Sequence, residues 1–379
     1  MTEPARVLIA ADKFKGSLTA AQVAEHVTAG LLAARPGTRI RSLPVADGGD
    51  GTVAAAVAAG STPRTTEVTG PLGTPVTASW ALRGTTAVVE MAEASGLRHL
   101  PPEHFAPLAA TTHGTGELLR AALDAGARTV VLGVGGSATT DGGAGMLVAL
   151  GARLLDADGA PVPAGGGPLR ALHTADLSGL DGRLAGTEVV LAGDVDNPLT
   201  GPEGAAAFYG PQKGAGRREV AELDTALEHF VRVLDGGDPD GRAAGCARSP
   251  GAGAAGGLGF AALLALGAVF RPGIEVLLEV LGFDEAVRDA DLVITGEGSL
   301  DRQTLHGKAP AGVAAAARAR GRKVVAVCGR LALGTEELRG AGIEAAYPLT
   351  ALEPDPDRCM ADAAALLERA AGRLARDHL

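Results

Sequence analysis

Cysteine is scarce in this chain of 379 residues, which contains only Cys246, Cys328 and Cys359. An odd number of cysteines without a CxxC pair does not favour a disulfide framework. Neither an HExxH motif nor a Cys/His set with zinc-ligand spacing occurs, which argues against a zinc site. The absence of a GxSxG motif argues against an α/β-hydrolase. Because the cysteines do not indicate disulfide bonds, we expect reduced thiols and a cytoplasmic protein.

Long hydrophobic segments are also missing. The most apolar stretch, residues 254–270, is rich in glycine and alanine and reaches only the lower limit of a membrane-spanning length. We expect it to form a buried helix. The N-terminal sequence MTEPARVLIAADKFKG lacks the basic region and long apolar core of a signal peptide, so none is expected.

The sequence has fewer basic than acidic residues, 34 against 44, which gives a formal net charge of −10 at pH 7. This balance argues against nucleic acid or an anionic membrane surface as a partner. A small anionic substrate stays compatible, since local lysines and helix N-termini can hold one. Only five of the basic residues are lysines, and four of these occur in glycine-rich segments. A role of these lysine side chains in binding a phosphate would explain why they occur in these segments.

Glycine is abundant, with 56 residues that follow no three-residue period, so a collagen-like chain is excluded. Apolar residues make up 46% and charged residues 21%, which excludes wholesale disorder. A chain of this length typically folds into two domains. The glycines cluster in short loops, where the backbone bends sharply or approaches a ligand closely.

Strands and helices alternate at both ends of the chain. A strand is expected at 6–11, followed by a helix over 18–34 with Ser17 as its N-cap. A second strand and helix are expected at 39–45 and 52–59. This alternation is typical of an α/β fold with a doubly wound, Rossmann/flavodoxin-like parallel sheet.

The middle of the chain shows extended segments separated by turns, which indicates a mixed sheet. A helix is expected there over 145–155 and a surface loop over 235–253. The simplest organisation is a doubly wound α/β domain built from 1–65 plus 285–379, with a second α/β domain of mixed sheet, 66–284, inserted. Active sites favour the cleft between two such domains, so we expect the site there.

Five segments share one arrangement, in which a strand ends in a glycine-rich loop that carries carboxylates, hydroxyls or lysines. Ligands bind at the carboxyl ends of the strands in open α/β sheets. The first segment, ADKFKGS, places Lys13, Lys15 and Ser17 at a helix start, which suits a phosphate or carboxylate. A solvated loop with an N-cap serine is its structural alternative.

The second segment, ADGGDGT, contains Asp47 and Asp50 around Gly48 and Gly49. Two carboxylates three residues apart on a flexible backbone suit Mg²⁺ coordination or proton transfer. A tight turn in which aspartate caps the next helix explains the same residues without a ligand.

The third segment, GVGGSATTDGGAGM, is the most glycine-rich and indicates a phosphate-binding loop, although it lacks the GK[ST] ending of a Walker A motif. Its start fits GxGxxA, and Asp156 follows at the distance that a dinucleotide site requires. Its candidate phosphate-binding residues are Gly135, Gly136, Ser137, Thr139, Asp141, Gly142 and Gly143.

The fourth segment, GDVDNPLTG, carries Asp194, Asp196 and Asn197, and a GPQKG sequence with Lys213 follows it. These groups suit Mg²⁺ or a polyol, and a turn containing proline is the alternative. The fifth segment, TGEGSLDRQTLHGKAP, ends at a helix start, where a lysine is well placed for a transferring phosphate. Its candidate residues are Glu297, Ser299, Asp301 and Lys308.

These five segments, in this order, resemble the bacterial glycerate kinase family of type I. The resemblance covers nearly the whole chain, from ADKFKGSLTA to GEGSLDRQTLHGKAPAGVA, with DVDNPLTGPEGAA, YGPQKGA and PGAGAAGGLGF between them. It implies two α/β domains, a cytoplasmic enzyme and ATP-dependent phosphorylation of D-glycerate. It also favours 2-phosphoglycerate as product, whereas the residues themselves do not indicate which hydroxyl reacts.

For a kinase, positioning and neutralisation of charge matter more than covalent chemistry. The catalytic candidates are Asp47, Asp194, Lys308 and Lys13, with Asp47 and Asp194 both open as the base. Mg²⁺ would be held by Asp194, Asp196 or Glu297. Two other functions stay open, a nicotinamide-dependent dehydrogenase that uses the GxGxxA start and a non-catalytic protein that binds sugar acids. The oligomeric state is not predicted.

Overall fold

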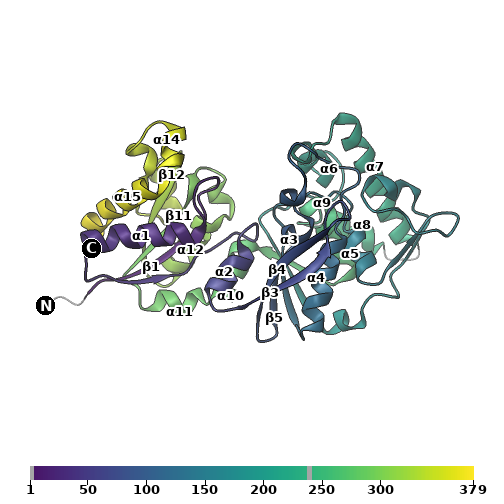
Figure 1. The fold of residues 1–379 in the computed structure, drawn as a ribbon, viewed down its shortest axis with the longest axis horizontal. Coiled ribbons are helices and arrows are strands. Elements are labelled where there is room, and N and C mark those ends of the chain that lie inside the picture. Colours follow the sequence, from purple (N-terminus) through teal and green to yellow (C-terminus); the bar gives the residue numbers. More distant parts are fainter. Residues whose placement is uncertain (1–3, 237–240) are drawn as a thin grey trace. The chain divides into compact units, whose positions relative to one another are not determined.

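A computed structural model describes residues 4–236 and 241–379 of the chain. The chain forms two compact units, which we describe separately (Figure 1). The first unit comprises Met1–Asp47, Ala54–Gly60 and Pro272–Leu379, and the second comprises Gly48–Val53 and Ser61–Arg271. These divisions lie on the N-terminal side of the boundaries expected after residues 65 and 284.

A five-stranded parallel sheet forms the centre of the first unit, in the order β13-β12-β11-β1-β2. The central strands β1, β11 and β12 are apolar because helices cover both faces of a parallel sheet. The strands are β1 (Arg6–Ala11), β2 (Arg39–Ser42), β11 (Leu292–Leu300), β12 (Lys323–Leu331) and β13 (Ala345–Pro348). The helices are α1 (Ala20–Ala34), α2 (Thr52–Ala58, which continues from the second unit), α10 (Gly273–Leu281), α11 (Phe283–Arg288), α12 (Ala309–Ala319), α13 (Thr335–Gly340), α14 (Pro356–Ala361) and α15 (Ala363–His378).

Side chains that alternate along β1 enter two different cores. Val7 and Ile9 pack in the core that α1 and α15 share, and these two helices lie side by side (Figure 1). Leu8 and Ala10 pack in the core formed with α10 and α12. Both faces of the sheet are therefore covered by helices, which confirms the predicted doubly wound parallel sheet.

The first helix begins later than expected. Thr19, rather than Ser17, is the N-cap of α1: the Thr19 hydroxyl accepts a hydrogen bond from the Gln22 amide, and the Gln22 side chain accepts one from the Thr19 amide. The Ser17 hydroxyl donates to the Phe14 carbonyl at 3.1 Å, because the chain turns back on itself between Phe14 and Leu18. The prediction that Ser17 caps this helix is wrong.

The second unit contains a six-stranded mixed sheet in the order β10-β9-β6-β5-β4-β3. Its β5, β6 and β9 pair in parallel, whereas β3, β4 and β5 pair in antiparallel fashion, which confirms the predicted mixed sheet. The strands are β3 (Thr62–Thr69), β4 (Pro75–Arg83), β5 (Thr86–Glu90), β6 (Thr129–Gly133), β7 (Arg153–Leu155), β8 (Thr174–Asp176), β9 (Glu188–Gly193) and β10 (Val269–Pro272). The helices are α3 (Ala92–Ser95), α4 (His113–Asp124), α5 (Ala144–Ala149), α6 (Ala205–Tyr209), α7 (Arg217–Asp235), α8 (Arg242–Ala247) and α9 (Ala254–Ala265).

The helix expected over 145–155 is shorter in the structure. α5 ends at Ala149, and Gly151 adopts a left-handed φ of 113°, which no regular helix contains. The chain then forms β7, which pairs antiparallel with β8. The second half of this predicted helix is therefore a strand.

The expected surface loop over 235–253 also differs, in the part that the structure describes. Residues 237–240 lie outside that part, but α8 follows them and buries Ala243 and Ala247 in the core of the second unit. The Asp235 carboxylate accepts hydrogen bonds from the amides of Ala243 and Ala244, which fixes the start of this helix. The glycine-rich composition therefore concealed a packed segment.

The apolar stretch after residue 253 forms the buried helix α9, as predicted. Its first turn is irregular, because Ala255, Gly256 and Gly257 adopt left-handed backbone angles. Across residues 4–236 and 241–379, the helices are too short or too polar to cross a membrane.

Candidate active site

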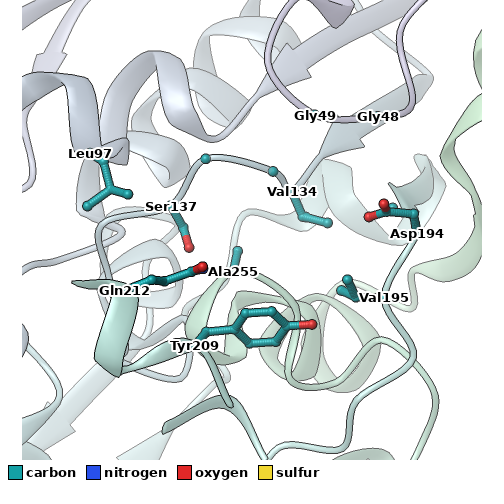
Figure 2. A pocket seen from close by; sticks show the side chains of 13 residues that line it. Gly48, Gly49, Leu97, Val134, Ser137, Asp194, Val195, Tyr209, Gln212 and Ala255 are labelled. Atoms are coloured by element: carbon teal, nitrogen blue, oxygen red, sulfur yellow. The ribbon is translucent and has the colours of Figure 1, made fainter. Parts of the chain in front are cut away.

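A pocket in the second unit lies where the second, third and fourth glycine-rich segments meet. Figure 2 shows Ser137 and Gln212 on one side of it, Asp194 on the other, and the ring of Tyr209 between them. The lining residues are Gly48, Gly49, Leu97, Val134, Gly135, Gly136, Ser137, Gly193, Asp194, Val195, Tyr209, Gln212 and Ala255.

The second and third segments touch through their backbones, and glycine makes this contact possible. A Cβ atom on Gly135 would lie 2.5 Å from the Cα of Gly49, and one on Gly133 would lie 2.6 Å from the carbonyl oxygen of Gly48. Both distances are shorter than any real contact of a Cβ atom allows. The doubled glycines therefore bring two loops together that larger residues would hold apart.

The backbone amides of Gly135, Gly136 and Ser137 are available to a ligand. In the part of the chain that the structure describes, their N–H groups donate to no other protein group, although the Gly136 carbonyl accepts from Leu97. Gly136 has a φ of 74°, and a left-handed residue in such a loop turns successive N–H groups toward one point. This wall of the pocket is suited to an anion.

Asp141 follows Ser137 in the same segment and holds the backbone of this segment in place. Its carboxylate is fully buried and accepts hydrogen bonds from the Thr112 hydroxyl and from the amides of Thr112, Gly143 and Gly145, at 2.8 to 3.2 Å. Burial raises the pKa of Asp141, and these hydrogen bonds oppose the rise. Since its oxygens face the protein interior, we assign Asp141 to holding the loop rather than to binding phosphate.

Thr139 and Lys213 are buried behind the same loop. The Lys213 side chain is 1% exposed, and its Nζ donates to the Thr139 carbonyl at 2.6 Å. Burial lowers the pKa of Lys213 to about 7. Gly142 and Gly143 continue the loop with left-handed angles, and they contact α7 and α9 rather than the pocket.

The fourth segment supplies two exposed carboxylates beside the pocket, Asp194 and Asp196. Burial raises the pKa of Tyr209 to about 12, and the charges of both aspartates act in the same direction. The Tyr209 hydroxyl donates to the Asn197 side chain at 2.5 Å, and the Asn197 amide donates to the Glu203 carbonyl. Asn197 therefore orders the loop, while the aspartates remain at its surface.

These two aspartates fit a magnesium ion. No group of three or more His, Cys, Asp or Glu residues is preformed for a metal in the described ranges. Mg²⁺ nevertheless binds through one or two carboxylates, keeps several waters and takes further oxygens from substrate phosphates. The donor chemistry of Asp194 and Asp196 beside an anion-binding wall meets that requirement.

Glu90 is a residue of this site that the sequence reasoning missed. Its carboxylate is 2% exposed and accepts hydrogen bonds from the amides of Gly51 at 3.3 Å and Val53 at 2.5 Å. Burial raises its pKa to about 7, and the charges of Glu93 and Asp50 add to this rise. Glu90 thereby holds the loop that contains Gly48 and Gly49. Glu90 is the last residue of the strand TAVVE. A carboxylate at the end of a largely apolar strand is the signal by which the sequence could have indicated this residue.

The first unit contains a separate group of carboxylates at the carboxyl ends of β1 and β11. Asp12 follows β1, is 9% exposed and accepts a hydrogen bond from the Lys13 amide at 2.6 Å. Burial raises the pKa of Asp12 to about 7, and the charges of Asp47 and Glu297 contribute. Burial also raises the pKa of Glu297, whereas the Thr304 hydroxyl, which donates to it, and the charge of Lys308 oppose the rise.

The remaining candidates of the first unit surround this group. Lys308 precedes α12 as its N-cap, and its Nζ lies 3.4 Å from the Gln303 side-chain oxygen. The Asp301 side chain accepts from the Gln303 amide at 2.9 Å and from the Ser299 hydroxyl at 3.4 Å, which closes a turn. Lys15 is exposed in the loop after β1.

The predicted site residues divide between the two units. The second unit holds Gly48, Gly49, Asp50, Gly135, Gly136, Ser137, Thr139, Asp141, Gly142, Gly143, Asp194, Asp196, Asn197 and Lys213. The first unit holds Lys13, Lys15, Ser17, Asp47, Glu297, Ser299, Asp301 and Lys308. Asp156, on which a dinucleotide site depended, accepts from the amides of Asp158 and Ala160 in an exposed turn and does not line the pocket.

Comparison with known proteins identifies the family of the whole chain. The model of the glycerate kinase family matches residues 7–379. A glycerate kinase of Bacillus subtilis (strain 168) is 46% identical over 98% of this chain and 97% of its own length. A glycerate 2-kinase of Escherichia coli (strain K12) is 45% identical over 90% of each chain.

A solved structure of a protein with a related sequence has the same fold as this chain. The crystal structure of a candidate glycerate kinase 2 from Salmonella typhimurium LT2 superposes with a TM-score of 0.84 at 42% identity. The alignment covers 99% of this chain and 98% of that one. The chain belongs to the glycerate kinase family.

Proposed function

We propose that this protein transfers the γ-phosphoryl group of ATP to D-glycerate, and that the 2-hydroxyl is the acceptor. Membership of the glycerate kinase family supports the reaction class, and the name of the Escherichia coli relative supports the position. The observation that carries the proposal is the row of residues Gly135, Gly136 and Ser137, which line the pocket and whose amides donate to no other group of the described chain. Such a row suits the phosphate chain of a nucleotide.

The lysines of the first unit are assigned to the transferring group. Phosphoryl transfer spreads negative charge over the phosphoryl oxygens, and fixed cations neutralise it. Lys308 and Lys13 take this role, and Lys15 and Ser17 bind the glycerate carboxylate. Ser299 and Asp301 shape the turn that precedes Lys308.

One carboxylate accepts the proton that leaves the glycerate hydroxyl. Asp47 and Asp194 are the two candidates, and both follow the carboxyl end of a strand region. Asp47 lies near Asp12 and Glu297, whose pKa values are raised in its presence. Asp194 lines the pocket itself.

Mg²⁺ is the cofactor that we propose, held by Asp194 and Asp196, with Glu297 as a further candidate ligand. When bound, it would neutralise phosphate charge and orient the leaving group. We further propose that the two compact units are two domains, and that the enzyme is cytoplasmic and acts without a nucleic-acid or membrane partner.

The test is an assay of ATP consumption with D-glycerate and Mg²⁺, in which the phosphorylated product is identified by phosphorus NMR. Formation of ADP together with 2-phosphoglycerate is the expected result. Formation of 3-phosphoglycerate would overturn the proposed position, and an absence of ADP would overturn the kinase reaction. L-glycerate in place of D-glycerate is the matched control.

A further inference from the structure

Lys213 is an unusual side chain in this fold, because it is among the largest fully buried ones and carries an amino group. Lysine is almost never fully buried, since desolvation of the ammonium is costly. In the interior, its Nζ donates a hydrogen bond of 2.6 Å to the carbonyl oxygen of Thr139. A buried apolar side chain would pack there without this cost, so the amino group requires an explanation.

The position of Lys213 in the chain supplies that explanation. It ends the short 3-10 helix Pro211–Lys213, directly after Gln212, which lines the pocket together with Tyr209. Its acceptor, Thr139, lies two residues after Ser137, and Ser137 and Gln212 line the same side of the pocket (Figure 2). One hydrogen bond therefore ties the segment of Tyr209 and Gln212 to the anion-binding loop.

Asp141 also fixes the loop, through the amides of Gly143 and Gly145. Its carboxylate also raises the pKa of Lys213 against the lowering by burial. Neutral and charged amino groups both donate to a carbonyl, so the hydrogen bond to Thr139 does not depend on the charge state.

We propose that Lys213 is a positioning residue that fixes the anion-binding loop of Gly135, Gly136 and Ser137 for the nucleotide phosphates. The assignment rests on the proposed kinase function for its ligand. Lys213 does not line the pocket, and it acts through the peptide of Thr139. Its loss should therefore affect the nucleotide more than glycerate.

The first test is Lys213→Met, which preserves length and removes the donor. We expect the KM for ATP to rise roughly tenfold, equivalent to about 1.4 kcal/mol, because the buried Thr139 carbonyl loses its partner. The KM for glycerate should stay within about twofold of wild type. Lys323→Met is the matched control, since Lys323 is an exposed lysine at the start of β12, and both KM values should be unchanged there.

A purely structural role predicts a different pattern. A rise of both KM values to the same extent, or a loss of activity in proportion to loss of folded protein, would overturn the positioning role. Unchanged KM for ATP in a folded Lys213→Met protein would overturn it as well.

A second readout separates this proposal from the proposed function. If the wild-type enzyme consumes no ATP with glycerate, the kinase proposal fails, and hydrogen exchange of the amides in residues 139–145 then tests Lys213 directly. Faster exchange in Lys213→Met than in wild type supports the tether, and equal exchange contradicts it.

If Lys213→Met does not fold, wild-type protein labelled with ¹⁵N-lysine provides the measurement. The chain has only five lysines, so the Nζ resonance of a buried one is readily distinguished. We expect that resonance to exchange slowly with water and to shift on addition of inorganic pyrophosphate. A pyrophosphate titration that shifts the loop amides but leaves this resonance in place would overturn the proposal.

Discussion

Lys308 is the single residue whose charge we expect to matter most for turnover. It is partly exposed at the start of α12 and contributes little to the core, so Lys308→Ala should fold normally. Loss of one electrostatic donor to the transferring group typically lowers kcat by about 10²–10³. Steady-state kinetics with ATP and glycerate measures the effect, with Lys323→Ala as control. Near-normal kcat in folded Lys308→Ala would remove this lysine from the mechanism.

Gly135 tests the contact between the two loops of the pocket. A Cβ atom at this position would lie 2.5 Å from the Cα of Gly49, and neither backbone can yield without moving the loop. We expect Gly135→Ala to lower kcat/KM for ATP by at least about tenfold, equivalent to about 1.4 kcal/mol.

The control for this substitution is Gly182→Ala in the same unit, where an added Cβ atom meets no neighbour within 4 Å. Its kcat/KM should equal that of wild type. Equal values for Gly135→Ala and wild type would show that the loops are not held together as described.

At the scale of the element, α1 illustrates how a cap is selected. Thr19→Ala removes one half of a capping box and should lower the free energy of unfolding by about 1 kcal/mol. Ser17→Ala should cost less, because the Ser17 hydroxyl bonds a turn carbonyl rather than a helix amide. Scanning calorimetry of both variants measures the difference. A larger loss in Ser17→Ala than in Thr19→Ala would contradict this assignment.

Elements also show which local patterns were informative. The apolar run at 6–11 predicted β1 to the residue, because a buried parallel strand needs continuous apolar side chains. The pattern after Gly145 predicted a helix too long, because Gly151 takes a left-handed angle that ends it. Glycine in a helical pattern permits that angle without requiring it, so only the structure distinguishes the two cases.

At the scale of the whole molecule, buried carboxylates govern how stability depends on pH. Burial raises the pKa of Glu90 and of Asp12 to about 7, above their values in an unfolded chain. A raised pKa means that the folded state holds a proton more tightly, so this contribution to stability is present at low pH and is lost as the pH rises to about 7. The free energy of unfolding should therefore fall between about pH 4.5 and 7.

Denaturant unfolding at several pH values measures this slope. Trp80 is buried in the second unit and is the one tryptophan of the sequence, so its fluorescence follows the unit that contains Glu90. Glu90→Gln should flatten the slope, and Glu188→Gln, which changes an exposed carboxylate, should leave it as in wild type. An unchanged slope in Glu90→Gln would show that Glu90 is not the titrating group.

The sequence by itself determined the α/β class, the doubly wound and mixed sheets, and the membership of Gly48, Gly49, Gly135 and Asp194 in loops after strands. These follow from local rules, because alternation of apolar runs and glycine-rich turns reports on residues close in the chain. The resemblance to glycerate kinases added the prediction of a reaction, the ATP-dependent phosphorylation of D-glycerate.

Only the tertiary structure decided what each polar group of those loops faces. Asp141 and Lys213 read as ligands of phosphate, but both are buried and bind the backbone of the loop instead. Glu90 read as the end of a strand, yet it holds the loop of Gly48 and Gly49. Burial and hydrogen-bond partners depend on segments that are far apart in the chain. The residue type alone therefore does not show whether a carboxylate or ammonium group binds a substrate or the protein itself.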